Sequence, residues 1–399
     1  MQAKNKPTLH VSGSFLNHAS QQDIVFIIDT ISTAYAVAIM AKGRAIHCIY
    51  ECKEITWRKA DYVALFDFIL SDVSFLSKVV ISVPHPYLSP SKTIAGRIVR
   101  QMKFARSIRK HAPLEPNRTY VSSSVSSLLI GHRRRVNVIL IDEGMSSVVA
   151  RNRFAFRGNR LVERLKVAIG DCLLSFQFPI STPQITLTND PHPCVVETLD
   201  YRDFESTAFA ASLVRLKGLM EDGKCHVLVL LKGPSWGVAG HHDEAHQYGD
   251  AYTEFNLHAI VAYLNQFPKD VSPVFFLKSH PSLGSSNGKL TVLIEALKSR
   301  GLLSYDALSY IDFAEASSLP AEGVLRHLPF EHVLALDASS LLWNVAWHGE
   351  VKCFMPLKHI VAFSETEGGI HTELYQLQDR INQLMGQHVT YFDVESGPI

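Results

Sequence analysis

The stretch Val136-Asn-Val-Ile-Leu-Ile-Asp-Glu-Gly144 decides the fold that this sequence predicts. Its first six residues form an apolar, β-branched run of the kind found in buried strands of parallel sheets. Two adjacent carboxylates and a glycine follow directly. Because open α/β sheets bind their ligands at the carboxyl ends of their strands, the stretch predicts a buried strand that ends in reactive side chains.

Strands and helices alternate on both sides of this stretch. Further predicted strands cover residues 23–28, 45–50, 78–83, 118–121, 225–231, 274–277, 308–312 and 332–336. Predicted helices cover residues 32–40, 61–76, 94–110, 204–221, 251–267, 290–299 and 320–327, with one more from residue 340 and a closing helix over 372–385. This alternation predicts an α/β fold with doubly wound parallel sheets.

The alternation stops once and then restarts. Residues 181–193 hold three prolines among turn-forming residues, which indicates a linker. We therefore predict a loose arm over residues 1–22, a Rossmann-like domain over 23–190 and a second Rossmann-like domain over 191–399, whose last helix packs back on the first domain. Two such domains predict a central cleft between them.

The composition bounds the class of protein. The chain has 399 residues, of which 47% are hydrophobic and 19% charged, enough to build large cores. No apolar run reaches the roughly 18 residues that cross a bilayer as a helix, and the first residues lack the apolar segment of a secretory signal. The six cysteines are scattered, and Cys48 and Cys52 have no second pair at zinc-ligand spacing. We expect reduced thiols in a cytoplasmic protein.

Charge is distributed unevenly along the chain. The net charge is +1, yet residues 97–166 hold 16 Lys or Arg and four Asp or Glu, a local balance of +12 that leaves −11 for the rest. Such asymmetry predicts a positive surface for an anionic partner. A solvated surface is the alternative, but no acidic residue lies between Arg97 and Leu114. The predicted surface comprises Arg97, Arg100, Lys103, Arg106, Arg109, Lys110, Arg133, Arg134, Arg135, Arg151 and Arg153.

Two strand ends offer groups for acid–base chemistry. Of Asp142 and Glu143, one can act as a general base while the other orients it; a turn that caps a helix is the alternative. In the second half, a predicted strand runs into Lys278-Ser-His280-Pro281. The proline biases His280 toward an extended backbone, and an imidazole there can donate to, or protonate, a phosphate leaving group. A histidine satisfied within a turn is the alternative.

Three further features fit a nucleotide. Ser339 and Ser340, at the predicted start of a helix, offer hydroxyls and backbone N–H groups to a phosphate, although a serine there can equally cap the helix. Glu322 can accept hydrogen bonds from ribose hydroxyls, or it can simply stabilise the first turn of its helix. The glycine loop that contains Gly233 follows a strand but matches neither common phosphate-loop pattern.

The sequence does not predict a metal or another cofactor. No Asp-x-Asp occurs in the chain, so the usual carboxylate pair that holds a metal on a sugar-diphosphate donor is missing. The group of His241, His242, Asp243 and His246 has ligand types that suit a metal, but it lies in a polar stretch and is interpreted as a solvated loop.

Together these motifs are more specific than each is alone. The triplet Asp142-Glu143-Gly144, the pair His280-Pro281 and the pair Ser339-Ser340, in this order, resemble the three signatures of bacterial sialyltransferases. Within that group the chain most resembles the capsular α-2,8-polysialyltransferases, with the lipooligosaccharide sialyltransferases as near relatives.

The resemblance implies a GT-B fold and an inverting, metal-independent transfer of sialic acid. The donor would be CMP-sialic acid and the acceptor the non-reducing end of a sialic acid polymer, in capsule synthesis. It implies Glu143 as the general base, with Asp142 as its support, and His280 as the general acid or phosphate stabiliser. The substrate- and nucleotide-binding residues would be Gly144, Gly233, Lys278, Pro281, Glu322, Ser339 and Ser340, with Glu331 as a competing match for the ribose ligand.

The resemblance also implies partners. Association with the cytoplasmic face of the inner membrane and with capsule export machinery is expected. The basic surface favours a polymerase, because polysialic acid carries one carboxylate per sugar. A mono-sialyltransferase that acts on lipooligosaccharide stays open, since basic residues also bind anionic lipid. A nucleic-acid-binding protein is a distant alternative, because the basic region offers few aromatic residues for base stacking.

Overall fold

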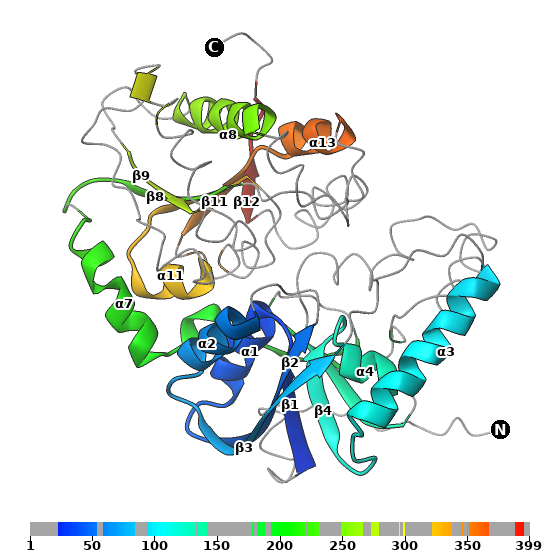
Figure 1. Ribbon diagram of the computed structural model, residues 1–399. Helices are drawn as coiled ribbons and strands as arrows, with labels where there is room; N and C mark the ends of the chain where they lie inside the picture. Colours follow the sequence, from blue (N-terminus) through cyan, green and yellow to red (C-terminus); the bar gives the residue numbers. More distant parts are fainter. Residues whose placement is uncertain are drawn as a thin grey trace, which may run out of the picture. The chain divides into compact units, whose positions relative to one another are not determined.

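A computed structural model gives the fold (Figure 1). It describes residues 23–53, 59–83, 94–132, 135–141, 178, 182–187, 193–220, 222–231, 249–265, 273–278, 295, 298–299, 321–336, 345, 349, 351–366 and 388–394. These residues fall into two compact units, and each unit is built on one parallel sheet.

The first unit contains a seven-stranded sheet in the order β3-β2-β1-β4-β5-β6-β7, with all neighbours parallel. Its order reverses between β1 and β4, which makes this pair the topological switch point of a Rossmann-like sheet. The strands are β1 Ile24–Ile28, β2 Ala45–Lys53, β3 Ser74–Val83, β4 Thr119–Ser123, β5 Asn137–Ile141, β6 Gln184–Thr186 and β7 Val195–Thr198. The helices are α1 Ile31–Met40, α2 Lys59–Ile69, α3 Ile94–His111 and α4 Ser127–His132.

The sequences of β1 and α1 explain why these two elements form part of the core of this unit. All five residues of β1 are apolar and buried, as expected for a central strand covered on both faces. Thr30 caps α1, because its Oγ1 accepts a hydrogen bond from the backbone N–H of Thr33 at 3.1 Å. α1 itself is buried from Thr33 to Met40, which identifies it as a core helix.

Helices cover both faces of the first sheet (Figure 1). Tyr50 Oη on β2 donates a hydrogen bond to Asp67 Oδ1 on α2 at 2.8 Å. The next residue of β2, Glu51, accepts from the backbone N–H of Ser127 on α4 at 2.7 Å. Successive side chains of a strand point to opposite faces. α2 and α4 therefore cover opposite faces of the sheet.

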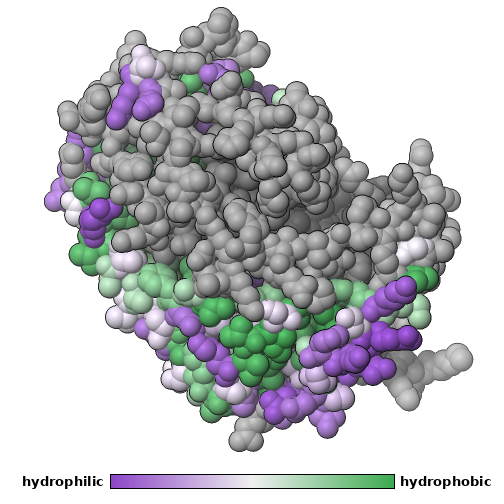
Figure 2. Space-filling view, in the orientation of Figure 1, coloured by the Kyte–Doolittle hydropathy of each residue, from purple (hydrophilic) through white to green (hydrophobic). Residues whose placement is uncertain are grey.

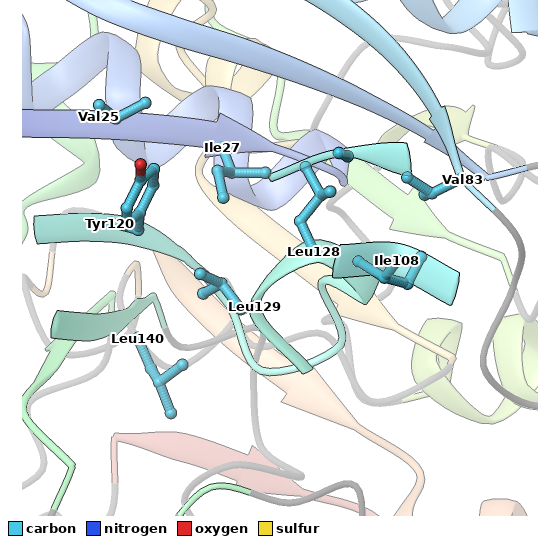
Figure 3. Packing of buried hydrophobic residues seen from close by; sticks show 9 residues of the cluster. Val25, Ile27, Val83, Ile108, Tyr120, Leu128, Leu129 and Leu140 are labelled. Atoms are coloured by element: carbon cyan, nitrogen blue, oxygen red, sulfur yellow. The ribbon is translucent and has the colours of Figure 1, made fainter. Parts of the chain in front are cut away.

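The core on the α4 face also holds α3 in place (Figure 3). A side chain at Gly131 of α4 would put its Cβ 2.5 Å from Ile108 Cγ2 of α3, so the two helices approach closely because position 131 is a glycine. The buried residues of this core are Val25, Ile27, Val83, Ile108, Ala112, Tyr120, Leu128, Leu129 and Leu140.

The second unit contains a five-stranded parallel sheet in the order β12-β11-β10-β8-β9. Among these strands the order reverses at β8 and β10, the switch point of this unit. The strands are β8 His226–Leu230, β9 Val274–Lys278, β10 His332–Ala335, β11 Lys352–Met355 and β12 Val389–Tyr391. The helices are the 3-10 helix η3 Tyr201–Asp203, α7 Thr207–Lys217, α8 Gly249–Leu264, α11 Ala321–His327 and α13 Leu357–Thr366.

Aromatic side chains fix the helices on the second sheet. Tyr263 of α8 packs edge-on against Phe275 of β9, with ring centroids 6.1 Å apart. The next residue of β9, Phe276, packs against Phe330, which follows α11. Because neighbouring strand residues point to opposite faces, α8 and the segment after α11 lie on opposite faces of this sheet.

Most predicted elements that fall within the described ranges are confirmed, with shifted ends. The predicted helix over 61–76 is wrong beyond Ile69, because residues 74–76 belong to β3. The elements that the sequence did not predict are α4, β6, β7, η3, β11, α13 and β12. The predicted elements over 308–312 and 372–385 lie outside the described residues, as does most of 290–299 and of the helix from residue 340.

The predicted linker over 181–193 is wrong in part, because it contains β6. Leu140 N–H donates to Pro183 O, and Gln184 N–H donates to Cys194 O, both at 2.9 Å. These bonds join the stretch to the sheet on both sides. Its prolines are tolerated because they lie outside the short strand itself. The first sheet therefore runs through β7 to residue 198, beyond the predicted domain boundary after residue 190.

Candidate active site

The predicted motifs follow strands whose carboxyl ends the structure describes. β5 ends at Ile141, immediately before the acidic triplet, and Ile141 pairs with Ser123 at the end of β4. β9 ends at Lys278, two residues before His280. β10 ends at Ala335, four residues before Ser339. The predicted site residues that lie outside the described ranges are Asp142, Glu143, Gly144, Gly233, His280, Pro281, Ser339, Ser340, Arg133, Arg134, Arg151 and Arg153.

In the second unit, three strands end side by side at the switch point. Leu231 N–H donates to Lys278 O at 2.8 Å, and Leu336 N–H donates to Leu230 O at 2.9 Å. The chain therefore leaves β9, β8 and β10 at one edge of the sheet. Doubly wound sheets bind ligands in the crevice outside this edge, at the point where the strand order reverses.

Lys278 is the one predicted nucleotide-binding side chain whose burial the structure describes. It is the last residue of β9, and only 4% of its surface is exposed. Lysine is almost never buried to this degree unless its charge is compensated. Lys278 is therefore a buried basic residue at the carboxyl end of β9, in the second sheet.

Glu322 and Glu331, the two residues that compete for the role of ribose ligand, lie toward opposite edges of the second sheet. α11 leads into β10 through a short connection, so its C-terminus is near the amino edge and its start points toward the carboxyl edge. Glu322 is the second residue of α11. Glu331 lies at the amino edge, where its Oε2 accepts from His226 N–H at 2.6 Å. Of the two, Glu322 is placed toward the end of the sheet where a nucleotide would bind.

The sequence analysis missed a buried carboxylate at the switch point of the first sheet. Asp29 directly follows β1 and is 6% exposed. Its Oδ1 accepts hydrogen bonds from Thr33 Oγ1 at 3.0 Å and Ser122 Oγ at 3.2 Å. Its Oδ2 accepts from Ser123 Oγ at 2.6 Å. The network ties the ends of β1 and β4 together at the position where many sheets of this type bind a ligand.

A second buried carboxylate, Glu51, supports the same region. It is 2% exposed and lies on β2. Its Oε1 accepts from Ser127 N–H at 2.7 Å, and its Oε2 accepts from Ser126 Oγ at 2.6 Å and Leu128 N–H at 3.1 Å. These backbone N–H groups open α4 and have no partner within the helix. Glu51 therefore fixes the turn between β4 and α4, next to the strand that precedes Asp142.

A signal for Asp29 was present in the sequence. It ends an apolar run in the same way as Asp142 ends the run from Val136 to Ile141. Glu51 carries no such signal, because it lies inside a strand and its partners are 75 to 77 residues away along the chain.

The predicted basic surface is partly described, and much of it lies on α3. This helix follows β3 and precedes β4, so it starts toward the carboxyl edge of the first sheet and ends toward the amino edge. Lys103, Arg106 and Lys110 are exposed, and Arg109 is half-buried. Figure 2 shows hydrophilic side chains gathered over this helix. Arg97 and Arg100 belong to its first two turns.

The C-terminal end of α3 and Arg135 form a basic group at the amino edge. Burial lowers the pKa of His132, and the charges of Arg109 and Arg135 lower it further, although the hydrogen bond to Leu128 O opposes this. Arg135 is exposed and lies just before β5. The structure thus brings Arg109 and Arg135 together beside His132, at the opposite end of the sheet from the carboxyl end of β5.

The other reactive side chains near the second sheet form a structural cluster. Tyr263 Oη lies 2.7 Å from His332 Nδ1, and Cys225 Sγ lies 3.9 Å from the same nitrogen. Burial raises the pKa of the Cys225 thiol and lowers the pKa of His332, so both groups are held neutral. Where side chains are described, no group of three or more His, Cys, Asp or Glu residues is arranged to hold a metal ion.

Comparisons with known proteins leave the family of this chain open. No protein-family model matches it, and no curated protein matches its sequence. Solved structures that align with it include the trehalose-6-phosphate phosphatase N-terminal domain of Candida albicans, at 11% identity and a TM-score of 0.39 over 92% of this chain and 94% of that one.

Two further alignments with solved structures have similarly low identities and TM-scores. The UDP-GlcNAc 2-epimerase of Neisseria meningitidis bound to UDP-GlcNAc aligns at 10% identity and a TM-score of 0.41, over 93% of this chain and 95% of that one. LpCGTa in complex with UDP aligns at 10% identity and a TM-score of 0.42, over 91% and 90%. Scores this low decide neither the fold nor the activity of this chain.

Within the described parts of the chain, no helix is both long and apolar enough to cross a bilayer.

Proposed function

We propose that the chain is an inverting sialyltransferase of GT-B type that transfers sialic acid from CMP-sialic acid to a sialic acid polymer. One observation carries this proposal: the strands that precede His280, Gly233 and Ser339 end side by side at the switch point of the second sheet. That edge is where a doubly wound sheet binds a nucleotide. The sequence motifs supply the chemistry, and the topology supports their convergence.

The donor nucleotide is assigned to the second unit. Ser339 and Ser340 bind the CMP phosphate through hydroxyl and backbone N–H groups, and Glu322 accepts from the ribose. The buried ammonium of Lys278 and the imidazole of His280 stabilise the charge that develops on the departing phosphate. Gly233 and Pro281 shape the loops that approach the nucleotide. A monophosphate carries less charge than a diphosphate, so these groups suffice without a metal.

The general base is assigned to the first unit. The anomeric carbon of sialic acid is fully substituted, so displacement passes through a state with oxocarbenium character. Inversion requires a base on the acceptor hydroxyl, on the face opposite the leaving nucleotide. Glu143 takes the proton, Asp142 orients it and Gly144 lets the acceptor approach the backbone. Asp29 holds the neighbouring end of β4, and Glu51 holds the turn that follows it, by the hydrogen bonds described above.

The acceptor is assigned to basic residues of α3 near the carboxyl edge of the first sheet and to two arginines that follow the acidic triplet in the sequence. Arg97 and Arg100 lie in the first turns of α3, which start toward that edge. Arg151 and Arg153 follow the acidic triplet in the sequence. A polymer with one carboxylate per sugar pairs with such a series of positive charges.

Mass spectrometry of the products formed from CMP-sialic acid and a short labelled oligosialic acceptor tests this function. Glu143→Gln and His280→Ala should each reduce transfer by at least about 100-fold, the range expected for loss of an acid–base group. Glu115→Gln and His258→Ala, at sites outside the proposed machinery, should retain activity. Full transfer by Glu143→Gln or by His280→Ala would refute the mechanism, provided circular dichroism shows a native fold.

A single-addition sialyltransferase is the second candidate. The observation that favours it is the position of Arg109 and Arg135, which lie toward the amino edge of the first sheet and away from the carboxyl end of β5. A short acceptor would not reach them. The same product analysis separates the two candidates, because a single added sugar at high donor concentration rejects polymerisation.

A further inference from the structure

The outward face of α3 combines apolar and basic side chains. Val99 is 50% exposed and Met102 is 62% exposed, both well above what a helix packed on a sheet requires. Lys103, Arg106 and Lys110 are also exposed. At the helical spacing of three and four residues these five side chains share one face of the helix.

This face is fixed in its orientation. On the other side of α3, Ile108 is 1% exposed and meets Gly131 of α4, and Phe104 packs against the same core. The helix cannot rotate to bury Val99 and Met102 without removing Ile108 from that core. The exposed apolar side chains are therefore a stable feature of the surface, available to a partner.

The basic residues on this face are not neutralised locally. No acidic residue occurs between Arg97 and Leu114. Within the described part of the chain, Lys103, Arg106 and Lys110 form no ion pair. An anionic partner is therefore expected, and such a partner must also cover Val99 and Met102 to gain from their burial.

We propose that this face of α3 binds the surface of an anionic lipid bilayer. An amphipathic helix that lies on a membrane inserts apolar side chains among the lipids, while Lys and Arg contact the head groups. Val99 and Met102 serve the first role, and Lys103, Arg106 and Lys110 serve the second. A soluble polyanion would pair with the charges but would leave the two apolar side chains in water.

The predicted basic surface on α3 therefore has two parts with different partners. Arg97 and Arg100 remain with the acceptor at the start of α3, whereas the exposed residues further along the helix contact lipid. The helix is about 27 Å long at 1.5 Å per residue, so its far end lies well away from the carboxyl edge. Bilayer binding does not depend on the proposed transferase activity and can be measured without substrate.

Co-sedimentation of the full chain with vesicles tests the inference. Vesicles of phosphatidylcholine with phosphatidylglycerol should bind the protein, and vesicles of phosphatidylcholine alone should not. The triple variant Lys103→Gln, Arg106→Gln, Lys110→Gln should weaken binding by about 100-fold, from about fivefold per charge. The double variant Val99→Ser, Met102→Ser should weaken it by about tenfold. The matched control is Val214→Ser, Leu219→Ser, which removes exposed apolar side chains from α7 and from the turn that follows it, and which should bind as the unmodified chain does.

Three results would overturn the inference: equal binding to neutral and anionic vesicles, unchanged binding by the apolar double variant, or loss of binding in the α7 control. A soluble oligosialic acid supplies the remaining comparison. If the triple variant loses affinity for that oligosaccharide but keeps its affinity for vesicles, the face binds the acceptor and not the bilayer. Circular dichroism should show native folding of each variant, and the apolar variant should keep its transfer rate on a soluble acceptor.

Discussion

Single residues of the first sheet show how a buried charge is tolerated at a strand end. Asp29 accepts three hydroxyl hydrogen bonds, from Thr33, Ser122 and Ser123. A buried carboxylate without such donors would be strongly unfavourable. The one hydroxyl proton of Ser122 is shared between Asp29 Oδ1 and Ile27 O, which lies 2.7 Å from Ser122 Oγ, so this hydroxyl joins the carboxylate to the backbone of β1. The hydrogen bonds of Asp29 therefore hold the ends of β1 and β4 together.

Removing this carboxylate should destabilise the protein. We expect Asp29→Ala to lower the free energy of unfolding by about 2 to 4 kcal/mol, because it leaves buried hydroxyls without their acceptor. Asp29→Asn keeps one acceptor oxygen and should cost less. Urea denaturation followed by circular dichroism measures both changes. Asp23→Ala, at an exposed position, is the control and should stay within about 0.5 kcal/mol of the unmodified chain. An equally small effect of Asp29→Ala would show that the network contributes nothing.

The residue scale also shows where sequence reasoning stops. A carboxylate that directly follows an apolar run can be found from the pattern alone, and Asp142 was found in this way. Asp29 follows the same pattern, but its burial depends on serines more than 90 residues away. Glu51 cannot be recognised at all from its neighbours. The roles of Glu143 and His280 come from resemblance and remain predictions.

At the scale of elements, small residues decide how closely helices approach each other. In the second unit, a Cβ at Gly323 of α11 would lie 2.4 Å from Phe209 Cζ of α7. Phe209 is fully buried and packs edge-on against Phe204, so its ring has little room to move. The contact sets the position of α11, and with it the position of Glu322.

A methyl group at this contact should separate the two helices. We expect Gly323→Ala to destabilise the protein by about 1 to 3 kcal/mol through overpacking, despite the better helix propensity of alanine. Adding Phe209→Leu should recover part of the loss, so the double variant should be more stable than the sum of the single changes implies. Thermal denaturation provides the measurement.

Gly218 supplies the matched control for this prediction. It caps α7 with φ of −68°, and its nearest non-neighbouring atom would lie 3.4 Å from an added Cβ. Gly218→Ala should therefore be neutral or slightly stabilising. If Gly323→Ala behaves in the same way, the contact with Phe209 does not constrain α11.

The elements that the sequence did not predict are mostly short. β6 has three residues, β7 and β11 have four, and β12 has three. Such segments are too brief to show a hydrophobic period, and pairing with a neighbouring strand stabilises them more than local preference does. β1, α1, β8 and β9 were predictable because each is a continuous apolar run with a clear stop.

On the scale of the whole molecule, buried and partly buried histidines link stability to pH. Burial is the largest cause that lowers the pKa of His132, His327, His332 and His359. The folded state therefore binds protons less readily than the unfolded chain, in which histidine titrates near about pH 6.5. As the pH falls through that value, protons bind the unfolded chain first and favour unfolding.

The free energy of unfolding should consequently fall between about pH 7.5 and pH 5.5. Urea denaturation at several values across this range measures the slope. His332→Gln should reduce the slope, since the substituted chain has one fewer histidine with a lowered pKa. A flat profile over this range, or a rise toward acid, would contradict the assignment. Staying above about pH 5 limits interference from carboxylates.

The general architecture was predictable from the sequence, and the strand order was not. Alternating apolar runs and helices predict two doubly wound sheets, and two parallel sheets are observed. Long-range pairing decides which strands are neighbours, and that order makes the carboxyl ends of β8, β9 and β10 adjacent at one edge. The sequence could name Ser339 and Gly233 separately, but only the pairing of β8 with β10 shows that the strands before them are neighbours.

The position of β7 has a consequence for synthesis of the chain. In the order of the first sheet, β7 is the outermost strand beyond β6, yet it is made last, just before η3 of the second unit begins at Tyr201. On the ribosome, β1 to β5 can pair while translation continues. β6 gains its outer neighbour, β7, only after Thr198 has emerged. A fragment that ends at residue 190 would expose the edge of β6. Any attempt to produce the first unit alone must therefore carry the chain through Leu199.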